Sequence, residues 1–275
     1  MSKTWLITGA STGLGRLMTK RLLARGDRVV ATLRQEGVLD ELRERHGKRL
    51  LVLTLDLTDV PGIREVTRQA FVQMGRIDTV VSNAGYGLFG AAEEFSDAQI
   101  DHQIATNLTG SIQLIRAVLP HLRAQGGGRI VQVSSEGGQK AYPNFSLYHA
   151  TKWGIEGFVE STAQEVAPFG IDFILVEPGP TATNFASGLV QGTPMDVYDA
   201  TPAGDIRRAL ANGSFEIKGS AIRTVDAMIA AADQVKPAFR LPLGSSAYKG
   251  IQQALKERLR ALEAQRDVAF SADVD

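Results

Sequence analysis

The segment SLYHATKWG, residues 146–154, places a tyrosine and a lysine where they could act together. Tyr148 and Lys152 are four residues apart, so on a helix they lie one turn apart on the same face. A phenol has a pKa near ~10, and a neighbouring ammonium lowers that pKa toward the range of general acid–base catalysis. The pair is therefore a candidate catalytic acid with its tuning cation. The alternative is two residues that share a helix face without a chemical role.

A glycine-rich loop near the N-terminus is a candidate phosphate-binding site. In TGASTGLG, residues 8–15, three glycines follow the pattern TGxxxGxG after the first strand-like run. Glycine lets backbone N–H groups approach a pyrophosphate, and the N-terminus of the following helix adds the positive end of its dipole. A plain turn is the alternative, which placement between a strand and a helix disfavours. The loop residues expected to contact the phosphates are Gly9, Ser11, Thr12, Gly13, Leu14 and Gly15.

The end of the second strand-like run distinguishes between two dinucleotides. NAD-binding sheets carry an acidic residue there, which holds the ribose hydroxyls. In VVATLRQ, residues 29–35, Leu33 takes that position and Arg34 follows it. A guanidinium suits the 2′-phosphate of NADP through a charge-assisted contact. We therefore expect NADP(H) rather than NAD(H), against the alternative of a solvated arginine that begins a loop.

The elements that must position these residues alternate between short apolar runs and longer amphipathic ones. The apolar runs are rich in Val, Ile and Leu, which is typical of parallel strands buried on both faces. Two helix-like stretches end at Gly26 and Gly75, and glycine is a good helix stop. This alternation predicts an α/β fold, a Rossmann-type doubly wound parallel sheet with helices on both faces and ligands at the carboxyl ends of its strands. The predicted strands are 4–8, 28–33, 50–55, 77–82, 128–135 and 171–178.

After Gly179 the alternation stops. The stretch from about 184 to 220 is mixed in character, and we expect it to form a substrate-binding lid. Residues from about 245 to 275 are expected to form a C-terminal helical extension with a loose tail. Without repeats or a Pro-rich linker, residues 1–275 are expected to form a single domain. The predicted elements of this part are helices over 224–235 and 248–266 and a short edge strand over 238–244, since Pro242 disfavours a central position.

Composition excludes several classes of function. The 275 residues carry 30 basic and 30 acidic side chains, so no net charge attracts nucleic acid or an anionic membrane. Without cysteine, disulfides and thiolate nucleophiles are ruled out, and the four histidines show no metal-ligand spacing. The N-terminus lacks the apolar region of a signal peptide, and no apolar run approaches the roughly 18 residues of a spanning helix. We expect a cytoplasmic protein with no metal, nucleic-acid partner or membrane association.

Several short motifs follow the glycine loop in order. They are DLTD (56–59), SNAGYG (82–87), NLTG (107–110), VSS (133–135), YHATK (148–152) and EPGPTAT (177–183). Their order and spacing resemble the short-chain dehydrogenase/reductase family, in particular its NADP-preferring carbonyl reductases, over roughly residues 4 to 183. The resemblance implies reversible hydride transfer between NADP(H) and a carbonyl or secondary alcohol.

The resemblance assigns catalytic roles to four polar residues. Tyr148 is the general acid–base, and Lys152 lowers its pKa and hydrogen-bonds the nicotinamide ribose. Ser135 holds the substrate oxygen; it lies thirteen residues before Tyr148, the family spacing, and so is preferred to Ser134. Asn107 supports a water that links the lysine to solvent. It lies in a helix-like segment, residues 98–123, where asparagine is locally unfavourable, which indicates a reason for its presence. The alternatives are a serine that caps a turn and an asparagine that faces solvent.

The resemblance also extends the cofactor site beyond the glycine loop. Asp56 resembles the residue that holds the adenine amino group, with a helix N-cap as the alternative. Small residues at the end of the fourth strand let the backbone pass close to the cofactor. The segment after the sixth strand resembles the loop that binds the nicotinamide carboxamide, with a plain turn as the alternative. With Arg34, Tyr148 and Lys152, the residues implied are Asp56, Leu57, Asn83, Ala84, Gly85, Pro178, Gly179, Thr181 and Thr183.

The sequence indicates only the broad chemical class of the substrate, which is expected to be a small molecule. Aromatic side chains at Phe89, Tyr142, Phe145 and Phe185 indicate a partly apolar pocket for a hydrophobic carbonyl or alcohol. His149 is expected to be structural or to face the substrate. Two alternatives stay open: a catalytically silent NADP-sensing or scaffold protein of this fold, and an NAD-preferring alcohol dehydrogenase. RLPLGSSAYKG stands where many relatives carry a Gly-Gly motif that helps to build a tetramer, so the expected homo-oligomer is a dimer or a tetramer.

Overall fold

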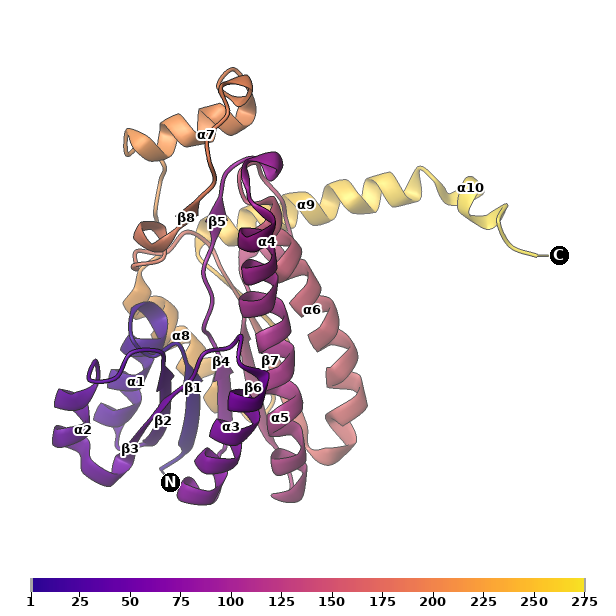
Figure 1. The fold of residues 1–275 in the computed structure, drawn as a ribbon. Helices are drawn as coiled ribbons and strands as arrows, with labels where there is room; N and C mark the ends of the chain where they lie inside the picture. Colours follow the sequence, from indigo (N-terminus) through magenta and orange to yellow (C-terminus); the bar gives the residue numbers. More distant parts are fainter. Residues whose placement is uncertain (1, 275) are drawn as a thin grey trace.

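The main sheet has seven parallel strands in the order β3-β2-β1-β4-β6-β7-β9 (Figure 1). The computed structural model describes residues 2–274, so the two ends of the predicted domain, Met1 and Asp275, lie outside the described residues. The predicted single-domain, doubly wound α/β fold is confirmed. The strands are β1 (Thr4–Thr8), β2 (Arg28–Leu33), β3 (Leu50–Thr54), β4 (Thr79–Ser82), β6 (Gly128–Val133), β7 (Ile171–Pro178) and β9 (Arg240–Leu243).

Helices cover both faces of this sheet because side chains alternate along each strand. On β1, Trp5 and Ile7 pack into the cluster made with α1, α2 and α8, whereas Leu6 packs into the cluster made with α3, α5 and α6. Figure 1 shows these two layers on either side of the strands. The helices are α1 (Gly13–Arg25), α2 (Asp40–His46), α3 (Val60–Met74), α5 (Gly110–Ala124), α6 (Ser146–Val166) and α8 (Ala221–Asp233).

Two of the predicted elements near the candidate site differ from the structure. The strand expected over 128–135 ends at Val133, because Ser135 begins a 3-10 turn over Glu136–Gly138 and its hydroxyl accepts a hydrogen bond from Gly137 N–H at 3.1 Å. The single helix expected over 98–123 is instead α4 (Asp97–Ile104), a π-helical turn (Ala105–Thr109) and α5. Both differences fall beside candidate catalytic residues.

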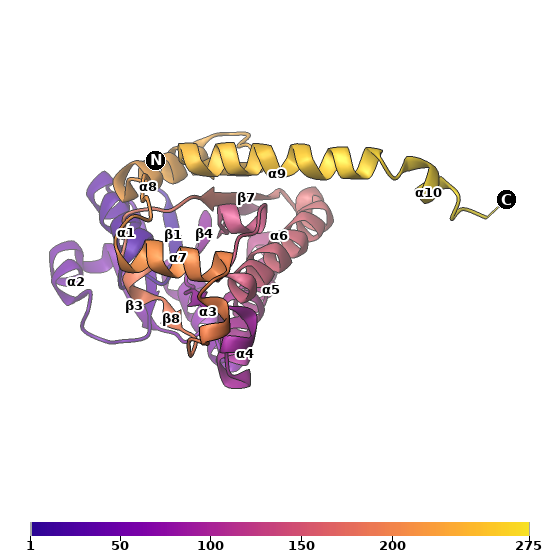
Figure 2. The same cartoon turned by 90° about the horizontal axis from the view of Figure 1, so that it is seen from above.

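A smaller layer stands above the carboxyl ends of the main strands. Strand β5 (Leu88–Phe89) pairs with β8 (Val190–Gln191), and α7 (Pro202–Ala211) lies above them (Figures 1 and 2). The predicted edge strand is confirmed as β9, which hydrogen-bonds to β7 at the border of the sheet.

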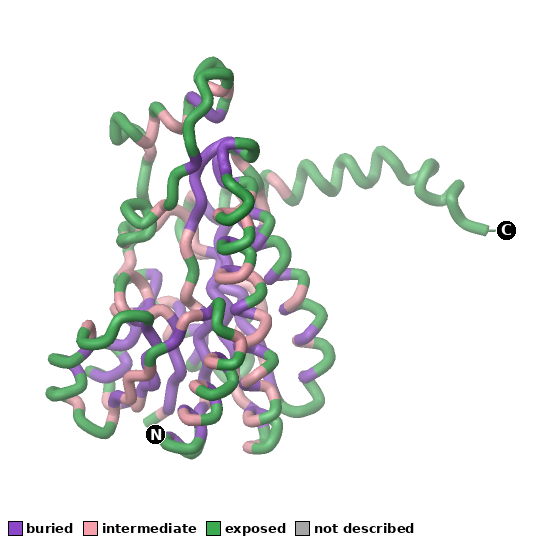
Figure 3. The backbone as a smooth tube through the Cα atoms, viewed as in Figure 1, coloured by how far each residue is buried: buried purple, intermediate pink, exposed green. Residues whose placement is uncertain are grey.

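The C-terminal helices extend away from the body of the molecule. Helix α9 (Ser245–Glu263) is followed by α10 (Arg266–Phe270), a short helix where the sequence predicts a loose tail. Figure 2 shows the extension leaving the body, and Figure 3 shows that its outer part is exposed. Within the described residues, no helix combines the length and the apolar character that crossing a membrane requires.

Candidate active site

A cavity of about 800 Å³ opens at the carboxyl ends of β1, β2, β4, β6 and β7. The strand order reverses between β1 and β4, and this switch point is where doubly wound sheets bind ligands. All of the sequence-predicted cofactor and substrate residues line the cavity except Gly15, and of the predicted catalytic residues only Asn107 does not. The structure therefore brings together residues that are up to about 170 positions apart in the chain, from Gly9 to Thr183.

The glycine loop owes its shape to close packing. Gly9 has a φ of +69°, and a Cβ atom there would lie 2.8 Å from the Cα of Ala84. Gly15 does not line the cavity because it packs behind the loop, where a Cβ atom would lie 2.4 Å from the carbonyl oxygen of Gly9. Thr12 precedes α1 in an extended conformation and makes no side-chain cap. The first N–H groups of α1 are thus left for an anion, which suits a phosphate.

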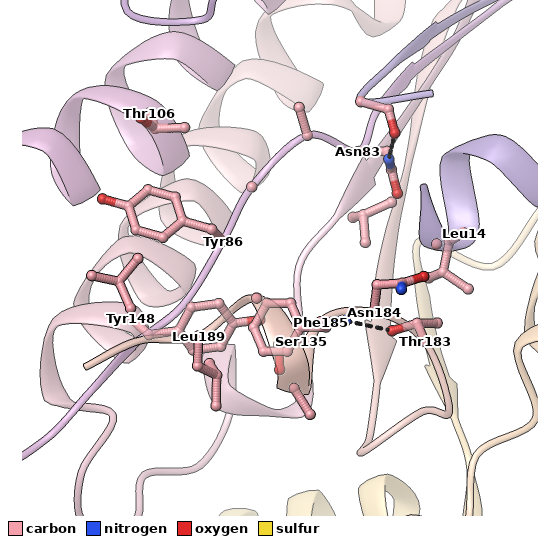
Figure 4. A pocket seen from close by; sticks show the side chains of 18 of the residues that line it. Leu14, Asn83, Tyr86, Thr106, Ser135, Tyr148, Thr183, Asn184, Phe185 and Leu189 are labelled. Carbon is pink, nitrogen blue, oxygen red and sulfur yellow. Dashed lines mark hydrogen bonds between the residues drawn. The ribbon is translucent and has the colours of Figure 1, made fainter. Parts of the chain in front are cut away.

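The end of β4 is tied to the glycine loop by Asn83. Its side-chain amide donates to the carbonyl oxygens of Thr8 at 2.9 Å and Gly9 at 3.3 Å. The N–H groups of Asn83 and Ala84 donate to the Thr8 hydroxyl at 3.0 and 3.1 Å. Asn83 therefore shapes the loop that faces the cavity (Figure 4).

Arg34 and Asp56 lie at the β2–β3 end of the cavity. Arg34 is exposed, and within residues 2–274 no carboxylate lies within ion-pair distance of it. Hydrogen bonds from the N–H and hydroxyl of Thr58, each 2.8 Å, lower the pKa of the Asp56 carboxyl, and Arg34 lowers it further. The N-cap of α3 is Asp59, which accepts from Gly62 N–H at 3.1 Å, so the capping alternative for Asp56 is excluded.

Tyr148 and Lys152 lie one turn apart on α6, and both are buried. The Lys152 ammonium donates to the carbonyl oxygen of Val133 at 2.9 Å and lies 5.5 Å from the centroid of the Tyr148 ring. Burial lowers the pKa of Lys152 to about 8, and the nearby Glu156 carboxylate opposes that shift. Lys152 is thus mostly charged at neutral pH.

The expected lowering of the Tyr148 pKa is wrong for this structure. Burial raises the pKa of the phenol to about 12; the Ser135 hydroxyl opposes the shift and the Glu136 carboxylate adds to it. Desolvation outweighs the neighbouring hydroxyl because the charged phenolate is the form that burial penalises. The phenol is therefore protonated at neutral pH and can act as an acid.

The two serines at the end of β6 have different partners. Ser134 donates its hydroxyl proton to Glu156 Oε1 at 2.5 Å. Ser135 accepts from Gly137 N–H, which leaves its own proton available to an oxygen atom in the cavity. This arrangement favours Ser135 over Ser134 as the residue that holds a substrate oxygen.

Asn107 lies in the π-helical turn and is buried, with an exposed fraction of 2%. Its Oδ1 accepts from Tyr86 N–H at 3.1 Å, and its Nδ2 donates to the Tyr86 carbonyl at 2.7 Å. The alternative of a solvent-facing asparagine is thereby excluded. The side chain holds the backbone after β4 in place, and the predicted water-supporting role stays a prediction.

Comparison with known proteins identifies the family. A family model described as short chain dehydrogenase matches residues 3–193. The chain belongs to the short-chain dehydrogenase family. It is an oxidoreductase of that family: the oxidoreductase BOA17 of Botryotinia fuckeliana (strain B05.10) is 34% identical over 274 residues, which cover 99% of this chain and 100% of the relative. The crystal structure of a short-chain dehydrogenase from Streptomyces avermitilis is 34% identical, with a TM-score of 0.90 over 99% of this chain and 98% of that chain.

Two further structures were solved with nicotinamide cofactors. A short-chain dehydrogenase from Burkholderia cenocepacia J2315 in complex with NADP is 25% identical, with a TM-score of 0.75 and coverage of 96% and 97%. A short-chain dehydrogenase/reductase from Burkholderia phymatum in complex with NAD shares the fold at 20% identity, with a TM-score of 0.81 and coverage of 96% and 95%. One of these two neighbours thus binds NADP and the other binds NAD.

In this short-chain dehydrogenase, an aromatic cluster lies around Tyr148. Phe89, Phe145 and Tyr148 pack together, and the Phe185 ring lies 5.5 Å from the Tyr148 ring (Figure 4). Sequence reasoning missed the aliphatic side chains that complete this wall. They belong to the segment after β7 and are Leu189, Ile206 and Leu210. The only signal in the sequence was the i, i+4 spacing of Ile206 and Leu210, which is typical of one helix face.

Helix α7 is held over the cavity by a buried ion pair. Arg207 donates to Glu94 Oε1 at 2.6 Å, and the Glu94 side chain is 1% exposed. The same carboxylate accepts from Ala91 N–H at 2.7 Å and from Met195 N–H at 2.8 Å. These contacts tie the proposed lid to the segment that follows β5.

Helix α6 carries a second buried charge cluster that the sequence did not reveal. Arg240 of β9 donates to Glu156 at 2.7 Å and to Glu160 at 2.5 Å, and it also pairs with Glu177 of β7. Glu156 and Glu177 are 2% and 1% exposed. Because Glu156 also accepts from Ser134, the cluster connects the sheet edge to the segment that carries Ser135.

His149 is expected to make the stability of the fold depend on pH in the acidic range. It is 4% exposed, packs edge-on against Tyr142 at 4.5 Å and does not line the cavity, which fits the structural alternative. Burial lowers its pKa from 6.5 to about 4. Between these values the unfolded chain binds a proton that the folded chain does not, so the free energy of unfolding should fall by about 3 kcal/mol as pH drops from 6.5 to 4.

Urea unfolding at a series of pH values measures this slope. In His149→Gln the contribution of the imidazole to the pH dependence of the unfolding free energy should disappear. This holds whatever the absolute stability of the variant. Equal slopes in the wild type and the variant would show that His149 is not the titrating group.

Proposed function

We propose that the protein is an NADP(H)-dependent carbonyl reductase, which transfers hydride reversibly between the nicotinamide and a carbonyl or secondary alcohol. The observation that carries this proposal is the meeting of Ser135, Tyr148 and Lys152 in the cavity that the glycine loop closes at its other end. Family membership supports the reaction class, and the predicted homo-oligomer and cytoplasmic location belong to the same proposal.

The fit of the dinucleotide rests on features of this cavity. The uncapped first turn of α1 suits the pyrophosphate, and the close approach of Gly9 to Ala84 leaves no side chain in its path. Arg34, without a carboxylate partner among the described residues, would meet the 2′-phosphate. The loop from Pro178 to Thr183 would hold the carboxamide.

The nicotinamide supplies the hydride, and the side chains supply the proton and the orientation. Ser135 donates a hydrogen bond to the substrate carbonyl oxygen, and Tyr148 gives its proton to the oxygen as negative charge develops. Because the pKa of Tyr148 is about 12, the proton that reduction requires is present on the phenol at neutral pH. The Lys152 ammonium stabilises the phenolate that is left.

A direct test is NADPH oxidation, followed by nicotinamide absorbance, against a panel of ketones and aldehydes. Turnover that is lost in Tyr148→Phe supports the proposal. If no carbonyl compound is reduced with NADPH or NADH while the cofactor still binds, the silent NADP-sensing alternative replaces it.

The cofactor preference rests on Arg34. In Arg34→Ala the KM for NADPH should rise about tenfold or more, because a charge-assisted contact is lost, whereas the KM for NADH should change little. Steady-state kinetics with each cofactor measure both values. Arg68→Ala, which removes an exposed arginine of α3, is the matched control. Equal effects of Arg34→Ala on NADPH and NADH would show that Arg34 does not recognise the 2′-phosphate, and a lower wild-type KM for NADH would favour the NAD-preferring alternative.

A further inference from the structure

A buried carboxylate beside the proposed reaction centre has fewer hydrogen-bond donors than its two oxygen atoms require. Glu136 follows Ser135 directly and lines the cavity, and its side chain is 4% exposed. Oε1 lies 3.2 Å from the Lys140 ammonium, whereas the buried Oε2 has no hydrogen-bond partner in the structure. A buried carboxylate oxygen without a donor is costly, so a donor is expected to reach it.

The mechanism proposed above gives this carboxylate no role. It lines the same cavity as Tyr142 and Tyr148, and its charge adds to the burial that raises the pKa of both phenols. Burial raises the pKa of the Glu136 carboxyl itself, because the charged form is short of hydrogen bonds. A donor on a bound molecule would relieve that shortage.

The charges around the cavity indicate what such a molecule carries. Among the described lining residues, the Asp, Glu, Lys and Arg side chains are Arg34 and Asp56 at the β2–β3 end, and Glu136 and Lys152 near Ser135. The Lys152 ammonium already donates to Val133. The substrate end therefore offers a hydrogen-bond acceptor that can carry a negative charge. The lining residues there provide no free cation that would bind an anionic substrate.

The remaining walls of the substrate end are apolar. Phe89 and Phe145 form an aromatic wall, and Leu189, Ile206 and Leu210 of the segment after β7 pack against it. The ion pair between Arg207 and Glu94 holds α7, which carries Ile206 and Leu210, in place. These walls bury hydrocarbon and would leave any further polar group of a ligand without a partner.

We infer that Glu136 accepts a hydrogen bond from the substrate, which is a carbonyl compound with a hydroxyl or amino group next to the reacting carbon and an apolar remainder. The inference rests on the proposed function, because it takes Ser135 and Tyr148 as the groups that hold the carbonyl oxygen. Glu136 is then a residue that determines specificity, and it transfers no proton in the reaction.

The test compares four ketones that share one phenyl skeleton. Acetophenone has no donor, α-hydroxyacetophenone and α-aminoacetophenone add one, and phenylglyoxylate adds a carboxylate. For the full chain with saturating NADPH, kcat/KM of each is divided by that of acetophenone. The intrinsic reactivity of each ketone is the same for every variant, so a change in a ratio reports the contact with Glu136.

In Glu136→Met the hydroxyl and amino ratios should fall roughly ten- to hundredfold, since a hydrogen bond to a charged group is lost. Glu136→Gln keeps the size of the side chain and should lower both ratios to a smaller extent. This variant replaces Glu136→Met in the test if the methionine variant folds poorly. The phenylglyoxylate ratio should rise in both variants. Glu165→Gln, on the exposed end of α6, is the control and should change no ratio.

Unchanged hydroxyl and amino ratios in both Glu136 variants would overturn the inference while the proposed function stands. A fall in only one of them identifies that donor as the group that Glu136 recognises. Absence of reduction of every carbonyl compound by the wild type is a separate result, and it would overturn the proposed function and this inference with it.

Discussion

Tyr148→Phe is expected to lower kcat for carbonyl reduction by about 10³-fold, while the affinity for NADPH changes little. The hydroxyl is the proton donor in the proposed reaction, and phenylalanine keeps the ring that packs against Phe89, Phe145 and Phe185. The glycine loop, where the phosphates are proposed to bind, lies at the other end of the cavity, so NADPH binding is not expected to depend on this proton.

Steady-state kinetics and NADPH fluorescence titration measure the two quantities separately. Tyr248→Phe is a matched control, because Tyr248 is 58% exposed on α9 and does not line the cavity. If Tyr148→Phe keeps near wild-type turnover, another group supplies the proton and the assignment is wrong. If NADPH affinity is lost together with turnover, the hydroxyl acts mainly in cofactor binding.

Arg240→Met is expected to reduce the free energy of unfolding by about 3–5 kcal/mol, because it leaves two buried carboxylates without their cation. Glu156 and Glu177 are almost fully buried, and Arg240 is the arginine that contacts both. Burial and Glu156 already raise the pKa of Glu177 in the presence of Arg240. Without the arginine, the pKa of the Glu177 carboxyl should rise further.

The sign of the pH dependence follows from that rise. A carboxyl whose pKa is higher in the folded than in the unfolded chain binds more protons when folded, so its contribution to stability grows as pH falls. The loss in Arg240→Met should therefore be larger at pH ~8 than at pH ~5. Urea unfolding at both pH values measures it, with Arg43→Met as a control at an exposed ion pair. A loss no greater than that of the control at either pH would show that the buried cluster contributes little.

The sequence predicted those features of the fold and the candidate site that depend on residues close together in the chain. Strand and helix periodicity predicted the parallel sheet, and motif spacing placed Ser135, Tyr148 and Lys152 at adjacent strand and helix ends. The π-helical turn at Asn107 could not be predicted, because it depends on hydrogen bonds to the backbone of Tyr86, 21 residues earlier. The raised pKa of Tyr148 could not be predicted either, because desolvation depends on all of the residues that pack around the phenol ring.

By itself, the sequence determined the family, the fold class and the order of the motifs, since these depend on residue types and on spacing within single elements. Only the tertiary structure decided what surrounds the site. It placed Glu136 without a donor for Oε2, brought Ile206 and Leu210 against the aromatic wall, and joined Arg240 to carboxylates 63 to 84 residues away. The physical reason is that burial and unsatisfied hydrogen bonds are properties of packing between distant segments, which no local pattern of residues records.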